Sequence, residues 1–154
     1  MFNWVKNDSE IEPYFEYCKL YEKIQEIGEG TDLTELYARI VSLNNFNNAN
    51  DLINQSEYFQ ALGKIVGKWH PVDESYCSGN LFEITNEFSF IDLLWEDKGS
   101  IKEYHIIIKD GYIAACTKQY LHPNDDVYKY LEVINENSVN YNIGLTDWEL
   151  CKRR

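Results

Sequence analysis

The chain has 154 residues, of which 44% are hydrophobic and 15% aromatic, enough for one packed core, so general disorder is excluded. Asp and Glu number 26 against 14 Lys and Arg, which gives a formal net charge of −12. Because proteins bind phosphate backbones by neutralising them with Lys and Arg, direct binding to nucleic acid or to an anionic membrane surface is disfavoured.

The first half of the chain has the periodicity of helices. Apolar residues at helical spacing predict helices over 12–27, 31–43 and 50–69. Gly28 ends the first, Asp32 has the spacing of a helix cap for the second, and His70-Pro71 ends the third. An asparagine-rich loop, 44–50, separates the second helix from the third.

The second half changes from helical periodicity to alternation. Strands are predicted over 81–85, 88–95, 101–108, 112–120 and 139–143. Asp110-Gly111 is typical of a two-residue hairpin turn. Residues 125–134 fit either a helix or a strand, and we favour the helix; 146–150 fit one helical turn. We therefore expect a single α+β domain over residues 1–154, with an N-terminal layer of about three helices packed on a C-terminal antiparallel β-meander.

The four cysteines, Cys18, Cys77, Cys116 and Cys151, are widely spaced and form no CxxC motif. The N-terminus does not resemble a signal peptide, and no apolar stretch is long enough to span a membrane. We therefore expect four free thiols in a cytoplasmic protein.

No catalytic or cofactor motif is present. His70, His105 and His122 have no metal-ligand spacing and are expected in turns and in the sheet. The acidic pairs Glu96-Asp97 and Asp125-Asp126 could bind a divalent cation, but turns rich in Asp are usually only turns. We expect no catalytic residues, no metal site and no cofactor, and a binding protein in preference to an enzyme.

Two tryptophans lie beside carboxylates at the ends of predicted elements. Trp anchors are enriched at binding hot spots, and flanking acids can pair with Arg or Lys of a partner. The alternative is that each Trp is in the core and each acid is solvated. The residues expected to bind a partner are Trp95, Glu96, Asp97, Asp125, Asp126, Asp147, Trp148 and Glu149.

These features favour a small acidic inhibitor that neutralises a basic enzyme. Size, charge and the lack of catalytic motifs suit a bacterial immunity protein directed against a nuclease toxin. This comparison is an analogy with a class of proteins and rests on no shared motif. One alternative is a phage-encoded anti-defence protein, acting against CRISPR or restriction systems. Another, from a different class, is a small-ligand-binding or enzymatic domain with a pocket between the helices and a curved sheet. The sequence leaves the partner's identity and the oligomeric state open.

Overall fold

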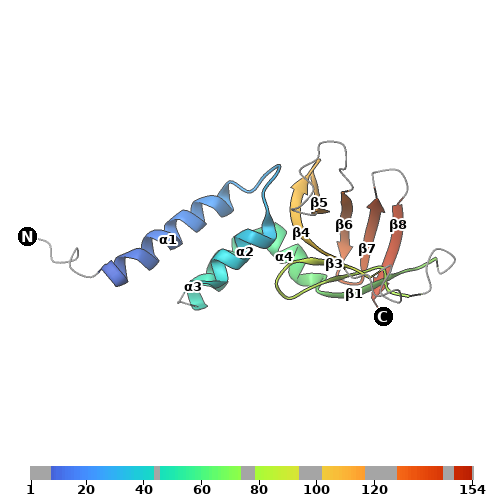
Figure 1. The fold of residues 1–154 in the computed structure, drawn as a ribbon, viewed down its shortest axis with the longest axis horizontal. Helices are drawn as coiled ribbons and strands as arrows, with labels where there is room; N and C mark the ends of the chain where they lie inside the picture. Colours follow the sequence, from blue (N-terminus) through green and yellow to red (C-terminus); the bar gives the residue numbers. More distant parts are fainter. Residues whose placement is uncertain are drawn as a thin grey trace, which may run out of the picture.

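A computed structural model describes residues 8–43, 46–73, 79–93, 102–116, 128–143 and 148–153. Within these ranges four helices precede eight strands (Figure 1). The helices are α1 (Asp8–Gln25), α2 (Leu33–Val41), α3 (Phe46–Asn54) and α4 (Glu57–Lys64). The strands are β1 (Gly67–Pro71), β2 (Phe82–Ile84), β3 (Phe90–Asp92), β4 (Lys102–Lys109), β5 (Tyr112–Cys116), β6 (Lys129–Asn135), β7 (Ser138–Ile143) and β8 (Trp148–Arg153).

The strands form a closed antiparallel barrel. Each strand pairs with the next in the chain, and β8 returns to pair with β1. The predicted helical layer over an open meander is therefore wrong, because the first and last strands join and leave no open sheet for a layer to cover. The helices gather at one side of the barrel, and α1 extends away from it (Figure 1).

Three strands of the barrel, including the two that close it, were not predicted as strands. We assigned β1 to the end of a helix, β6 to a helix and β8 to a helical turn. Each has only five to seven residues, too few to separate a period of 2 from a period of 3.6. Pairing with neighbouring strands decides their conformation.

The predicted third helix is also wrong, because it is two helices and ends earlier. Ser56 leaves the helical conformation, and its side chain accepts a hydrogen bond from the backbone of Phe59, which caps α4. At the other end, Gly67 has φ +131°, a conformation that L side chains rarely adopt. This glycine turns the chain from α4 into β1.

Two local predictions are confirmed. Asp32 caps α2, with its side chain accepting a hydrogen bond from the backbone of Glu35 at 3.0 Å. Asp110 and Gly111 have φ values of 53° and 80° and connect the paired residues Lys109 and Tyr112. These positive φ values are those of the turn that suits the twist of a hairpin.

Aromatic rings fill the barrel. Phe82 stacks on Trp69 of β1, Phe90 of β3 and Tyr141 of β7, with ring centroids 6.4, 5.1 and 5.2 Å away. Trp69, Phe82 and Phe90 are fully buried, and the Trp69 indole donates a hydrogen bond to the Ile65 carbonyl at 2.8 Å. Because buried aromatics remove large apolar areas from water, this stack is a main source of barrel stability.

The helices and the barrel share one core. Before α2, the chain lies along β4: Gly30 donates a hydrogen bond to the Ile108 carbonyl at 2.7 Å, and Ile108 donates one to the Thr31 carbonyl at 3.1 Å. In the turn between β2 and β3, the Phe88 ring packs on Tyr37 of α2, with 4.4 Å between centroids. The structure thus holds α2 against the barrel wall.

Cys18 and Cys151 are free thiols and Cys116 forms no disulfide, whereas Cys77 lies outside the described residues. Cys151 points into the barrel, and burial, together with the charge of Glu149, raises the pKa of its thiol from 9.0 to about 12. Among the described residues, no helix has the length and apolar character needed to cross a membrane.

The buried thiol makes the barrel sensitive to alkali. Above about pH 9 the Cys151 thiol ionises in the unfolded chain but stays protonated in the folded chain. The stability that the protonated thiol contributes is therefore complete below that pH and is lost as the pH rises. Between pH 8 and pH 10 the wild type should lose about 1 kcal/mol more unfolding free energy than Cys151→Ala, measured by urea denaturation. Val139→Ala, at the position paired with Cys151, keeps the thiol and should show the wild-type loss; an equal loss in Cys151→Ala would contradict the assignment.

Arg153 fastens the closing strand. Its guanidinium lies over the Trp69 ring, 4.7 Å from the centroid, and donates hydrogen bonds to the carbonyls of Lys64, Val66 and Glu136. Arg153 therefore has a structural role, because it ties β8 to β1 and to the end of α4.

Arg153→Met should lower the unfolding free energy by about 2 kcal/mol, because the apolar chain covers Trp69 but leaves the carbonyls without their donor. Urea denaturation followed by circular dichroism measures this. Lys68→Met, an exposed change on β1, is the control and should alter stability by less than about 0.5 kcal/mol. Equal stabilities of the two variants would mean that Arg153 does not hold the barrel closed.

Candidate functional site

The residues expected to bind a partner divide into two groups. Trp148 and Glu149 lie at the start of β8. The others lie outside the described residues: Trp95, Glu96, Asp97, Asp125, Asp126 and Asp147.

Trp148 belongs to a cluster of aromatic rings on the outer wall of the barrel. Its side chain is partly exposed (37% for the residue), and its ring lies 5.4 Å from that of Tyr112 on β5. Tyr112 lies 5.9 Å from Tyr130 on β6, and Tyr130 lies 6.1 Å from Tyr128. We call Tyr112, Tyr128, Tyr130 and Trp148 the aromatic face. The sequence indicated Trp148, but the tyrosines come from other strands and were not singled out.

Carboxylates lie at the edge of the aromatic face. The Tyr130 hydroxyl donates a hydrogen bond to Asp110 at 2.8 Å, and the Asp110 backbone donates one to Glu29 at 3.0 Å. Burial, the hydrogen bond to Asp110 and the charges of Asp110 and Glu29 raise the pKa of Tyr130 well above its usual value. The potential beside these rings is therefore negative.

Glu149 does not join this face. Residues of a strand alternate between the two sides of the sheet, and Glu149 pairs in register with the inward-facing Tyr141, whereas Trp148 pairs with Asn142. The acid and the Trp, adjacent in sequence, are thus directed to opposite sides of the barrel wall.

A buried ion pair lies inside the barrel. Lys129 and Asp92 are 6% and 7% exposed, and their Nζ and Oδ2 atoms are 3.3 Å apart. The Lys129 ammonium also lies 3.5 Å from the Tyr141 hydroxyl and 5.7 Å from the Tyr104 ring centroid. The two charges compensate each other, so the pair does not need an external ion. In the sequence, the feature that could have indicated this buried pair is Asp92, which is an isolated charge within the apolar run 88–95.

Removing one charge of this pair should destabilise the protein more than removing both. Lys129→Met and Asp92→Leu should each lower the unfolding free energy by about 3 kcal/mol, because each removes the ion-pair partner of a buried charge. The double variant should be more stable than either single variant in urea denaturation. Additive losses in the double variant would show that the two charges are not coupled.

The two described histidines lie in different strands. His70 lies in β1, His105 in β4, and His122 is outside the described residues. His105 Nδ1 lies 2.7 Å from Oδ2 of Asp32, whose other oxygen caps α2. In the part of the chain that the structure describes, no three His, Cys, Asp or Glu side chains form a group that could hold a metal ion.

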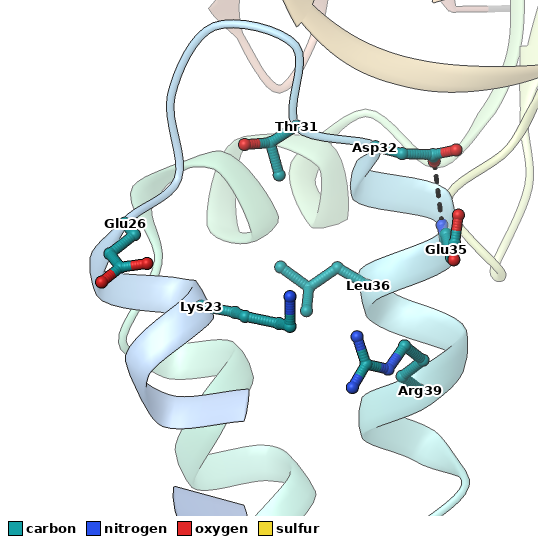
Figure 2. A pocket seen from close by; sticks show the side chains of 7 residues that line it. All are labelled: Lys23, Glu26, Thr31, Asp32, Glu35, Leu36 and Arg39. Atoms are coloured by element: carbon teal, nitrogen blue, oxygen red, sulfur yellow. Dashed lines mark hydrogen bonds between the residues drawn. The ribbon is translucent and has the colours of Figure 1, made fainter. Parts of the chain in front are cut away.

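Two hollows flank α2. One, of about 300 Å³, lies between α1 and α2, where Lys23 and Arg39 point toward each other (Figure 2). Arg39 is already paired with Glu16 at 3.1 Å. Three acids also line this hollow, Glu26, Asp32 and Glu35, so it does not concentrate charge of one sign.

The second hollow, of about 310 Å³, lies between α2 and the turn that joins β2 to β3. This is the position that the small-ligand alternative requires. Two of its hydroxyls already form hydrogen bonds within the protein, since Thr34 donates to the Phe88 carbonyl at 2.6 Å and Ser89 bonds with Thr85 at 2.7 Å. These two hydroxyls are therefore engaged within the fold.

Comparisons of this chain with protein-family models, curated proteins and solved structures found no match. The function is therefore argued from the geometry and electrostatics of the described residues.

Proposed function

We propose that this chain is an acidic inhibitor that binds a basic partner protein through the aromatic face. The observation that carries the proposal is the exposed ring of Trp148, which packs against Tyr112 on the outer wall of an acidic barrel. Rigid aromatic side chains offer a large contact area at a low cost in conformational entropy, and Trp and Tyr are enriched among binding hot spots.

The electrostatics favour a cationic partner. The chain has a net charge of −12, and Asp110 and Glu29 lie beside the rings. Arg and Lys of a partner can stack on aromatic rings and pair with these carboxylates. Within this chain, the Lys109 ammonium already lies 5.2 Å from the Tyr128 ring centroid, an intramolecular example of the same contact.

A nuclease-type toxin is the partner class that we favour, which makes the chain comparable in role to a bacterial immunity protein. Enzymes that act on nucleic acids neutralise phosphates with Lys and Arg, so their substrate surfaces are basic. An acidic protein is steered to such a surface over long distances and competes there with the substrate. We place the protein in the cytoplasm, where free thiols such as Cys18 and Cys151 persist.

The test begins with capture of partners on the immobilised full chain, in parallel with Trp148→Ala and Val41→Ala as baits. Val41 is an exposed apolar residue on α2, away from the aromatic face, and is the matched control. A partner that fits the proposal is basic, is retained by the wild type and by Val41→Ala, and is lost from Trp148→Ala.

Binding kinetics with the purified partner then distinguish the role of the Trp148 anchor, which affects dissociation, from electrostatic steering, which affects association. Trp148→Ala should speed dissociation about 30-fold, the change that corresponds to the loss of a 2 kcal/mol hot spot. Asp110→Asn should mainly slow association and weaken its dependence on salt, because it removes a charge while Asn keeps an acceptor for Tyr130 and tolerates the positive φ. Unchanged kinetics in both folded variants would refute the aromatic face as the binding surface.

A further inference from the structure

In the described part of the chain, one side of α1 is left uncovered by the other helices and by the barrel. Large apolar side chains are exposed on it: Tyr14 is 65% exposed, Phe15 54% and Tyr21 42%. The Tyr14 and Phe15 rings lie 6.2 Å apart. Tyr14, Cys18 and Tyr21 follow one another at spacings of four and three residues, so they line one side of the helix. We call Tyr14, Phe15, Cys18 and Tyr21 the α1 face.

The opposite side of α1 is fixed to the rest of the protein. Leu20 and Ile24 are buried, and Tyr17 packs against the core. Glu16 forms its ion pair with Arg39 of α2 at 3.1 Å. These contacts hold the helix in place while its N-terminal end extends away from the barrel (Figure 1). The α1 face is therefore presented on a rigid element, and exposed apolar patches of this kind mark interaction sites.

We infer that the α1 face binds a second copy of this chain, with the two α1 helices antiparallel about a twofold axis. In a twofold dimer the same surface of both subunits forms the contact, so that surface has to be complementary to itself. A helix face that is apolar along its centre and carries both signs of charge at its edge meets this condition. The inference is independent of the aromatic face and of its partner.

The charges beside the α1 face select the second copy as its occupant. Lys19 and Glu22 are both exposed next to it. A twofold axis midway between them, close to Tyr21, sets Lys19 of each copy opposite Glu22 of the other and gives two ion pairs. With Lys23 and Glu26, this part of α1 is locally neutral on a chain with a net charge of −12. A basic partner therefore gains little here, whereas a second α1 finds its charges matched.

Antiparallel packing also keeps the two acidic barrels apart. The barrel lies toward the C-terminal end of α1 (Figure 1), so the two barrels lie at opposite ends of the helix pair. An overlap of the helices over residues 14–25 is about 18 Å long at about 1.5 Å per residue. This is roughly twice the Debye length of about 8 Å at physiological salt. Repulsion between the barrels is therefore largely screened.

The size of the α1 face sets the strength of the dimer that we expect. One helix face provides less area than the roughly 1,600 Å² of a standard stable interface. The dimer should therefore be reversible, populated at about 100 μM chain and dissociated at about 1 μM. Sedimentation velocity on the full chain across this range measures it. A reducing agent in the buffer keeps Cys18 from forming a disulfide between copies, so that only the non-covalent contact is measured.

Two variants test whether the apolar contact lies on α1. Tyr21→Ser should weaken the dimer at least about tenfold, because it removes the ring closest to the axis. Ile134→Ser changes an exposed apolar residue of β6 and is the matched control, which should dimerise like the wild type. Circular dichroism verifies that each variant is folded. The inference is overturned if the wild type stays monomeric at about 100 μM, or if folded Tyr21→Ser dimerises as the wild type does.

An exchange of charges tests the antiparallel pairing. Lys19→Glu should weaken the dimer about fivefold, because it replaces two attractive pairs by two repulsive ones. Adding Glu22→Lys to it restores both pairs with exchanged signs and should return the dimer to near its wild-type strength. The pairing is refuted if Lys19→Glu has no effect or if the exchange restores nothing. A basic protein that the wild type captures and Tyr21→Ser loses would assign the α1 face to that protein and also overturn the inference.

Discussion

The pairing of β8 with β1 is the constraint on which the rest of the structure depends. Three registered pairs, Trp69 with Arg153, His70 with Lys152 and Pro71 with Cys151, join the two ends of the sheet. An open sheet would expose the unpaired edges of both strands and leave Trp69 without a cover. Closure removes both edges and places the stack of aromatic rings at the centre.

Closure also determines what the outer wall presents. Because alternate residues of each strand fill the barrel, the remaining ones face outward, and on β5, β6 and β8 several of these are aromatic. Trp148, Tyr112 and Tyr130 thus lie together although they are far apart in the chain. The acidic hairpin turn at Asp110 lies at their edge and adds negative charge. This combination of ring area and negative potential is the basis of the proposed binding to a cationic protein.

Two pairs of polar side chains connect elements of the fold, one between the helical region and the barrel wall and one inside the barrel. Asp32 caps α2 and also contacts His105 of β4, so one carboxylate serves a helix and a strand. Lys129 and Asp92 bury opposite charges among tyrosines, where each would be costly without the other. Such pairs restrict how the elements can be arranged, because a shift in register would leave a charge uncompensated.

The sequence by itself determined the features that depend on near neighbours. The charge, the cap at Asp32 and the hairpin at Asp110-Gly111 could be predicted because each rests on one or two residues and on local backbone geometry. Trp148 could be proposed as an anchor, but the tyrosines around it could not. Tertiary structure decided the closed barrel, the conformations of β1, β6 and β8, the aromatic face, and the pairs Lys129–Asp92 and Asp32–His105. The physical reason is that short segments have no conformation of their own until hydrogen bonds and burial against distant strands supply one.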